Sequence, residues 1–272
     1  MTDKTVRDWF PDPEQERPDP TRAAQQAMRP PLPKRFYATA TIAETEGGYG
    51  LRLDGRSART PGRRLLELPT RALGEAVAAE WQTQGEVVDP ARMPLTRLAN
   101  SAIDAVADDR AAVADDLLRY AGSDLVCYRA GAPERLVEAQ SRAWDPVLAW
   151  ARDELGARFT LSQGVTFVAQ PETAIAAARR AVDAVTDPFQ LAALHVMTTL
   201  TGSILLALAT ARAVLTPEAA WAAAHADEIF QESIWGEDAE AAERRRFRQV
   251  DFEAAARMFA LAQPAGRPPA EG

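Results

Sequence analysis

Phe189-Gln-Leu-Ala-Ala-Leu-His-Val-Met-Thr-Thr-Leu-Thr-Gly-Ser-Ile-Leu-Leu-Ala-Leu-Ala-Thr-Ala211 is a run of 23 residues without a charged side chain. A helix of this length could cross a hydrocarbon layer of about 30 Å. However, Asp187-Pro188 directly before the run is a helix start typical of water-soluble proteins. Several residues also dilute its hydrophobicity, namely Gln190, His195, Thr198, Thr199, Thr201, Gly202, Ser203 and Thr210. We therefore predict a central helix that is buried on most sides, and no stable membrane insertion.

Helical periodicity continues on both sides of this run. Leu73, Val77 and Trp81 recur at the spacing of one helix face, with Thr70 placed as the N-cap and Gly85 as the terminator. The other helices are expected at 93–106 and 113–122, and from Pro133, Glu172, Pro188, Pro217 and Asp238 onward. Asp145-Pro146 is expected to kink or restart the helix that begins at Pro133.

The part of the chain before residue 70 has the two-residue periodicity of strands. Side chains alternate over 36–43 and again at Tyr49, Leu51 and Leu53 after Gly47-Gly48, which predicts a β-hairpin. Residues 65–68 form a further expected strand, closed by Pro69. A second short hairpin about Gln163-Gly164 is indicated by Phe159, Leu161, Val165 and Phe167.

These patterns predict an α+β fold in which a small N-terminal antiparallel β domain precedes a larger, mainly α-helical C-terminal domain. Residues 1–33 are rich in proline and charge, so we expect an extended, partly disordered tail. The β-rich domain with its following helices is placed at 34–125 and the helical domain at 126–262, since glycine and proline cluster between residues 120 and 133. Residues 263–272 are expected to be a flexible tail.

The composition excludes several classes of function. The net charge of -8 and the pI near 5.0 argue against nucleic acid as a partner, because phosphate binding requires clustered Lys and Arg. Cys127 is the only cysteine, so no internal disulfide can form. Only two histidines occur, and no zinc-type spacing is present, so we expect no metal and no cofactor.

Catalytic motifs are also absent from the sequence. It contains no Walker A loop, no Gly-x-Gly-x-x-Gly and no Gly-x-Ser-x-Gly. One enzyme hypothesis stays open, an acid-base enzyme on a small anionic substrate. It would use His225 and Asp227, on adjacent helical turns, together with Arg56, whose guanidinium suits a carboxylate. This hypothesis requires a pocket in which these distant segments converge.

An aromatic residue and a block of acids near the C-terminus point to recognition of another protein. Trp235-Gly236 directly precedes Glu237, Asp238 and Glu240. Tryptophan supplies contact area and carboxylates supply orientation, so a partner surface that is apolar and basic would fit. The same spacing also fits a helix end at Gly236 and a helix start at the acids, where the helix dipole favours them. The two interpretations are compatible.

Several segments, taken together and in this order, resemble one protein family. They are Arg35-Phe-Tyr37, Leu53-Asp-Gly-Arg56 with Thr60-Pro61, Glu80-Trp81, Met93-Pro-Leu-Thr-Arg-Leu-Ala-Asn100, Tyr120, Asp124-Leu125, Cys127-Tyr-Arg129, Trp144-Asp145-Pro146, and Phe230-Gln231 through Trp235-Gly-Glu-Asp238. The chain resembles the assembly chaperones that receive the α subunit of the F1 part of ATP synthase. The resemblance extends from about Lys34 to Leu261.

The resemblance implies a chaperone, not an enzyme, that binds unassembled F1 α subunit and prevents its aggregation until the β subunit replaces it, without ATP hydrolysis. We expect it to be monomeric when free. The implied client-binding residues are Glu240, Asp238, Glu237, Trp235 and Glu232, and structural roles are expected for Trp81, Arg97 and Asp54.

The N-terminal residues bear on the cellular location. The chain opens without an apolar stretch, so we expect no secretory signal, and its early acids, from Asp3 to Glu16, are unlike a mitochondrial transit peptide. We expect a bacterial cytoplasmic protein. For eukaryotic relatives the resemblance implies the mitochondrial matrix.

Overall fold

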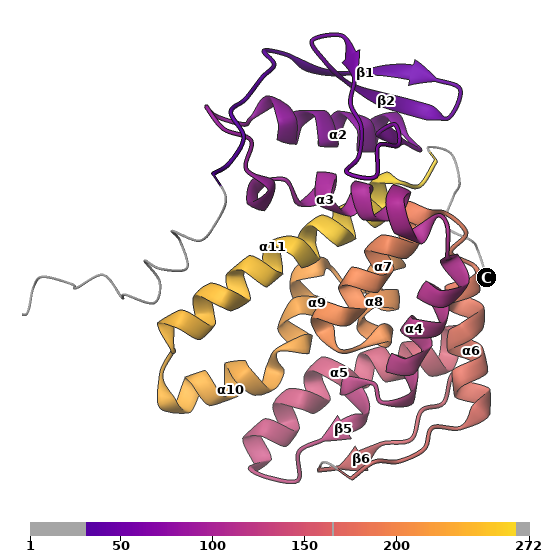
Figure 1. Cartoon of the computed structure of the whole chain (residues 1–272). Coiled ribbons are helices and arrows are strands. Elements are labelled where there is room, and N and C mark those ends of the chain that lie inside the picture. The colour runs from indigo at the N-terminus through magenta and orange to yellow at the C-terminus, as the bar shows by residue number, and fades with distance from the viewer. Residues whose placement is uncertain (1–30, 165, 265–272) are drawn as a thin grey trace, which may run out of the picture.

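A small sheet lies at one end of the molecule and a stack of helices forms the rest (Figure 1). The computed structural model describes residues 31–164 and 166–264. Within them, N-terminal antiparallel strands precede a mostly helical region, which confirms the predicted fold class. The predictions for the terminal tails fall almost wholly on residues 1–30 and 265–272, which lie outside the described residues, as does Val165.

The sheet is built on the predicted hairpin. β1 (Ala40–Thr45) pairs antiparallel with β2 (Gly48–Leu53), in a register that sets Ala40 opposite Leu53. β3 (Arg56–Ser57) and β4 (Glu67–Leu68) both pair with β2. The first strand begins at Ala40 rather than at residue 36, because the amides of Ala38 and Thr39 donate to the Asp54 carboxylate instead of to a neighbouring strand.

One face of the sheet is covered by α2 (Arg71–Gln82) (Figure 1). The Thr70 hydroxyl accepts from the amide of Leu73, which confirms the predicted N-cap. The helix ends at Thr83 rather than at Gly85. Gly74 permits close packing on the sheet, since a Cβ at this position would lie only 3.2 Å from the Cβ of Tyr49.

A second group of helices follows. It begins with a 3-10 turn at Pro90–Arg92 and continues through α3 (Pro94–Ser101), a π-helical turn at Ala102–Val106, α4 (Arg110–Gly122) and a 3-10 turn at Leu125–Cys127. The N-terminus of α3 has no cap from its own segment. The Glu80 carboxylate of α2 supplies one, accepting from the amides of Leu95 and Thr96 at 2.8 Å each.

In the middle of the chain, the structure contradicts the expected helix restart at Pro146 and the expected hairpin about Gln163. α5 (Glu134–Glu154) continues without interruption through Pro146, where buried Trp144 and Val147 anchor the helix on both sides of the proline. No hairpin forms among the described residues about Gln163; instead β6 (Ser162–Gln163) pairs in parallel with β5 (Tyr128–Arg129). α6 (Glu172–Asp183) follows and packs on α4.

The uncharged run forms two helices, not the single one predicted. α7 (Pro188–Thr201) ends at Gly202, whose φ of 67° is left-handed, and α8 (Ile204–Ala211) begins after Ser203. The Ser203 hydroxyl accepts from the amide of Leu206 and caps α8. Along the described chain, no helix has the length and apolar character needed to cross a membrane.

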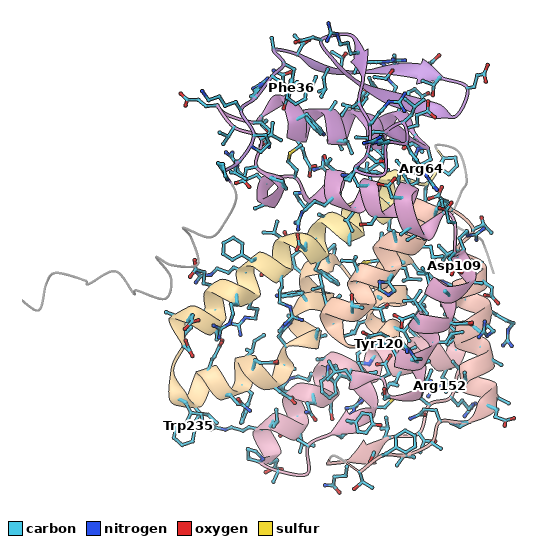
Figure 2. The ribbon with its side chains drawn as sticks, in the orientation of Figure 1. Phe36, Arg64, Asp109, Tyr120, Arg152 and Trp235 are labelled. Carbon is cyan, nitrogen blue, oxygen red and sulfur yellow. The ribbon has the colours of Figure 1, made fainter. Side chains whose placement is uncertain are left out.

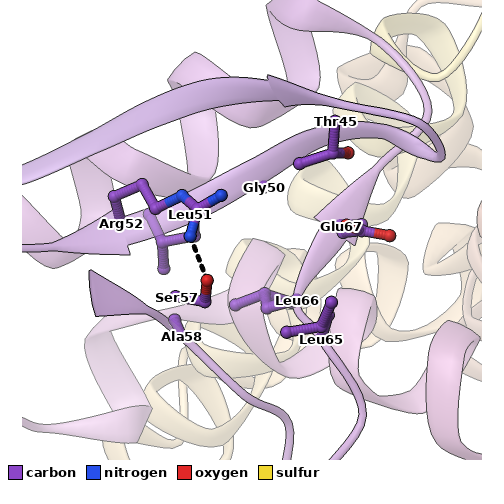
Figure 3. Close-up of a pocket in the computed structure, with 9 residues that line it drawn as sticks. All are labelled: Thr45, Gly50, Leu51, Arg52, Ser57, Ala58, Leu65, Leu66 and Glu67. Carbon is purple, nitrogen blue, oxygen red and sulfur yellow. Dashed lines mark hydrogen bonds between the residues drawn. The ribbon is translucent and has the colours of Figure 1, made fainter. Parts of the chain in front are cut away.

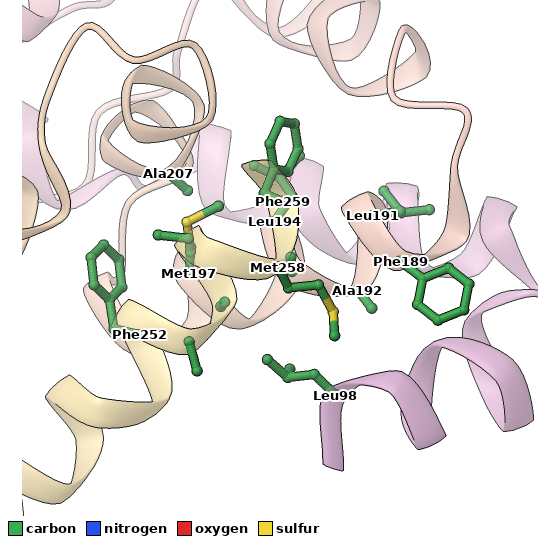
Figure 4. Packing of buried hydrophobic residues seen from close by; sticks show 14 of the residues in the cluster. Leu98, Phe189, Leu191, Ala192, Leu194, Met197, Ala207, Phe252, Met258 and Phe259 are labelled. Carbon is green, nitrogen blue, oxygen red and sulfur yellow. The ribbon is translucent and has the colours of Figure 1, made fainter. Parts of the chain in front are cut away.

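The core is centred on α7. The last helices are α9 (Pro217–Ala224), α10 (Ala226–Trp235) and α11 (Ala239–Leu261), and α11 lies along α7 (Figure 4). Leu194 and Met197 of α7 face Phe252, Met258 and Phe259 of α11 in one buried cluster. This cluster also includes Leu51 and Leu68 of the sheet, so apolar packing is continuous from the strands to the last helix.

A buried carboxylate holds the break between α7 and α8 in place. Asp124 has no solvent exposure, and its two oxygens accept from the amides of Val126 and Leu205 at 3.2 and 3.1 Å. The amide of Leu125 in turn donates to the Gly202 carbonyl. Burial raises the pKa of Asp124 to about 6, although hydrogen bonds from Ser203 and from these amides oppose the shift.

This pKa predicts a pH-dependent stability. Because the folded protein holds the Asp124 proton to a higher pH than the unfolded chain does, stability falls as pH rises from about 4 through about 6. Relative to Asp124→Asn, which cannot titrate, the wild type should lose roughly 1 kcal/mol of unfolding free energy between pH 5.5 and 7.5. Urea unfolding of both proteins at the two pH values measures the change. An identical difference at both would show that the carboxyl titrates below this range.

Candidate functional site

The helical hairpin formed by α10 and α11 carries the acid block predicted from the sequence. The two helices meet at one corner of the molecule, and Trp235 lies at this corner (Figure 2). Gly236 makes the turn with a φ of 85°, and Asp238 begins α11. Here the sequence dictates both features, since a glycine, which readily takes a positive φ, ends α10 and an acidic N-cap starts α11.

The hairpin exposes large apolar side chains. Trp235 is 85% exposed, and its neighbour Ile234 is also exposed. Ile229 on α10 and Phe247 and Val250 on α11 add to the apolar surface. In the first half of α11 only Ala242 is buried, so this part of the helix projects beyond the core. Such a concentration of exposed apolar groups beside charged ones is typical of a protein-binding surface.

The acids of the hairpin pair with arginines of the same chain. Glu232 and Arg245 form a bidentate pair between the two helices at 2.6 and 2.9 Å, with less than a third of each side chain exposed. The Arg245 guanidinium lowers the pKa of Glu232, chiefly through these hydrogen bonds. This pair fixes α10 to α11.

The remaining pairs lie on the surface. Glu240 accepts from Arg244 one turn along α11 at 2.5 Å, and Glu237 lies 3.5 Å from Arg246. Exposed pairs of this kind contribute only about 0–1 kcal/mol, so an arginine from another protein can replace the internal one at little cost. Six carboxylates and three arginines occur between residues 228 and 246, which leaves the segment acidic.

Asp238 has a structural task. Its Oδ1 accepts from the amides of Glu240 and Ala241 at 2.9 and 3.2 Å, which caps α11. Glu240 is accessible, with 64% of its side chain exposed, compared with 53% for Glu237 and 25% for Glu232. The hairpin therefore both starts a helix and displays acids, while the recognition role of these acids stays a prediction.

The three residues assigned structural roles lie elsewhere. Arg97 of α3 forms an ion pair with Asp251 of α11. Asp54 binds the amides of Ala38 and Thr39, and these bonds lower its pKa. Trp81 packs against Tyr37, with ring centroids 5.5 Å apart, and its carbonyl accepts from the Tyr37 hydroxyl at 2.7 Å.

The residues of the enzyme hypothesis are not brought together. His225 is buried with its ring 4.1 Å from that of Trp221, and its Nδ1 bonds to the Trp221 carbonyl. Asp227 accepts from Gln140 of α5 at 2.7 Å, which uses the carboxylate to attach α10. Arg56 lies on β3 in the sheet, at the opposite end of the molecule from α10 (Figure 1).

Two cavities at the sheet end of the molecule do not restore this enzyme site, because neither is lined by His225 or Asp227. The cavity between β2 and residues 57–67 holds only about 20 Å³, little more than one water molecule, and is lined partly by Leu51, Leu66 and the Arg52–Ser57 hydrogen bond (Figure 3). Across residues 31–164 and 166–264, moreover, no group of three His, Cys, Asp or Glu side chains is placed to hold a metal ion.

Sequence reasoning missed part of the exposed surface. It selected Trp235 but not Ile229, Ile234, Phe247 or Val250. A signal existed for Phe247 and Val250, since they are the only large apolar residues in a stretch of α11 that otherwise contains charged residues, Gln and Ala. The pairing of Glu232 with Arg245 had no local signal, because 13 residues and a turn separate them.

Comparisons with known proteins agree in pointing to one family. Residues 34–152 match the family model described as ATP12 chaperone protein. The Atu1473 protein of Agrobacterium tumefaciens is 50% identical, with a TM-score of 0.84 over 91% of this chain and 93% of that one. Atp12 of Paracoccus denitrificans is 44% identical, with a TM-score of 0.80 over 85% of this chain and 99% of that one.

A more distant relative is the mitochondrial protein atp12 of Schizosaccharomyces pombe. It is 23% identical over 153 residues, which is 53% of this chain. The matched part spans about half of that protein, 52% of its length.

The cap at Asp238 can be tested separately from any binding role. Asp238→Ala removes the acceptor for two amides, which costs about 1 kcal/mol of local stability, whereas Asp238→Asn keeps an acceptor. Amide hydrogen exchange at positions 240 and 241 should speed up roughly fivefold in the alanine variant and change little in the asparagine variant. Equal exchange in all three proteins would contradict the capping role.

Proposed function

The chain belongs to the ATP12 chaperone family, and from this membership we propose that it assists assembly of the F1 part of ATP synthase by binding the unassembled α subunit. The observation that carries the proposal is the α10–α11 hairpin, with Trp235 almost fully exposed beside exchangeable acids. In this role it holds the α subunit and prevents its aggregation until the β subunit takes its place.

The physical chemistry of an unassembled subunit supports this role. Such a subunit exposes an interface that a neighbour will later bury, and interfaces of this kind have an apolar centre and a polar rim. Trp235 and the adjacent apolar side chains cover part of the centre. Glu240 and Glu237 exchange their internal arginines for arginines of the client, and Glu232 and Asp238 hold the hairpin in shape. Complementary charge then speeds encounter and fixes the register of the complex.

The proposed chaperone works without ATP hydrolysis and is not an enzyme. Its binding energy comes from a surface that the β subunit also needs, so release follows from competition. We further propose that it is monomeric when free and acts in the bacterial cytoplasm. The mitochondrial protein atp12 of Schizosaccharomyces pombe would then be a relative that works in another compartment.

Glu240→Lys tests the recognition role of the acid block. The substitution reverses the charge of an exposed residue, so the fold should persist with a loss of about 1 kcal/mol or less, while capture of the α subunit should fall at least tenfold. Circular dichroism verifies the fold, and affinity capture of co-expressed α subunit measures binding. Glu75→Lys is the matched control, because Glu75 is also exposed and paired with an arginine on its own helix. Normal capture by folded Glu240→Lys would contradict the assignment.

The release step gives a second prediction. In a preformed complex of this protein with the α subunit, added β subunit should displace the chaperone, because both compete for one surface. ATP alone should release nothing, since no nucleotide motif is present in the sequence. Size-exclusion chromatography after each addition distinguishes the outcomes. Release by ATP without β subunit would refute the competitive mechanism.

A further inference from the structure

A cleft at the sheet end of the molecule has the properties of a binding site. Its volume is about 570 Å³, within the range of ligand-binding clefts. It lies between the segment that precedes β1, the turn from β2 to β3, and α2, and its lining includes Phe36, Tyr37, Arg56, Arg59 and Trp81. None of the residues proposed to contact the client through the hairpin belongs to it.

Aromatic rings form the apolar side of this cleft. Phe36 and Tyr37 are in edge contact with centroids 5.3 Å apart, and Tyr37 contacts Trp81. Tyr37 is held firmly, since its hydroxyl donates to the Trp81 carbonyl and the Arg35 guanidinium lies 4.7 Å above its ring. Phe36, in contrast, is 71% exposed. A rigid aromatic wall that ends in an exposed ring is suited to bind a large apolar side chain.

The described residues that line the cleft carry a net positive charge. Beyond the backbone pairing of Arg56 with Leu53, the Arg56 side chain forms no hydrogen bond or ion pair with any described residue, and Arg59 uses one side-chain nitrogen to donate to the Arg63 carbonyl at 2.7 Å. Asp54 is the one acid among the lining residues, and its oxygens already accept from the backbone of Ala38 and Thr39. In a chain with a net charge of -8, two guanidinium groups that have no carboxylate partner among residues 31–164 and 166–264 favour an occupant that brings one.

We propose that this cleft is a second contact site for the client, and that it takes a segment of the F1 α subunit in which a large apolar side chain adjoins Asp or Glu. The proposal rests on the proposed function. Phe36 and Trp235 lie at opposite ends of the molecule (Figure 2), and the two surfaces have opposite charge. A client held at both ends can dock in only one orientation, because reversing it would bring like charges together.

Two contacts of modest affinity also allow the client to be held firmly and yet be released. Once one end is bound, the other binds as an intramolecular event, which raises the overall affinity without any single strong contact. A competitor that displaces one end removes this advantage. The client then dissociates from the other end at the rate of a weak complex.

Site-specific photocrosslinking tests the cleft directly. Three full-length variants each contain p-benzoylphenylalanine, at position 36 in the cleft, at position 235 in the hairpin, or at position 167 as the control, and each is co-expressed with F1 α subunit. Phe167 is exposed to nearly the same extent as Phe36, 68% against 71%, and belongs to neither surface. We expect crosslinks to the α subunit from positions 36 and 235 and none from position 167.

The other outcomes separate the two proposals. Crosslinking from 235 alone would overturn the cleft proposal and leave the proposed function intact, whereas crosslinking from neither position would overturn both. A crosslink from position 36 to residues 1–30 of the same chain, or to a second copy, would give the cleft a different occupant and overturn this assignment.

Substitution of Arg56 tests the chemistry of the occupant. Arg56→Glu should weaken binding of the α subunit at least tenfold, and Arg56→Lys should retain most of it, because the positive charge persists. The Arg56 side chain is exposed and has no side-chain partner among the described residues, and its backbone pairing with Leu53 does not depend on the side chain, so neither variant should alter thermal unfolding. An unchanged affinity for Arg56→Glu, measured by biolayer interferometry, would refute the carboxylate requirement.

Discussion

The interruption of the uncharged run at Gly202 and Ser203 is the constraint on which the rest of the molecule depends. One continuous helix over this run would project part of its apolar surface beyond its neighbours, whereas α7 and α8 are short enough to be enclosed by α11, α4, α5 and α9. The break is held by the left-handed Gly202, the Ser203 cap and the buried Asp124, which binds the amide of Leu205. Because α7 in turn supports α11 along the second half of that helix, the position of the exposed hairpin follows from this single junction.

How much of the fold the sequence predicts depends on the range of the interactions involved. Thr70, Asp187 and Asp238 each cap a helix within three residues, so their helix starts were predictable from local chemistry. The continuous helix through Pro146 was not predictable from local chemistry, because the packing of Trp144 overrides a residue that normally breaks helices. The pairing of β5 with β6 was not predictable either, because a parallel pair joins segments far apart in sequence. Gly202 did carry a local signal, which the strong apolar character of the whole run obscured.

The same distinction applies to the candidate site. Trp235 followed by glycine and acids is a local pattern, and the structure places that tryptophan in solvent. The pair of Glu240 with Arg244 has the local i,i+4 spacing of one helix, whereas the pair of Glu232 with Arg245 depends on how α10 returns toward α11 and could not be deduced from spacing alone. The Glu80-Trp81 motif has a physical role in the structure, because Glu80 caps α3 from α2 and Trp81 packs on Tyr37. The pair thereby joins α2 to α3 and to the segment that precedes β1.

Under the proposed function, the internal pairing of the acids explains how the protein can bind its client both selectively and reversibly without ATP. When a client arginine replaces Arg244 at Glu240, the number of ion pairs changes little, so the exchange itself contributes little binding energy. In the proposed complex, most of the affinity comes from burial of Trp235 and its apolar neighbours, at about 25 cal/mol per Å². The acids instead decide which apolar surface is accepted, because a partner with carboxylates at its rim would meet like charge. A natural subunit partner that buries more of the same surface gains more free energy from it, and so displaces the chaperone without any input beyond its own binding.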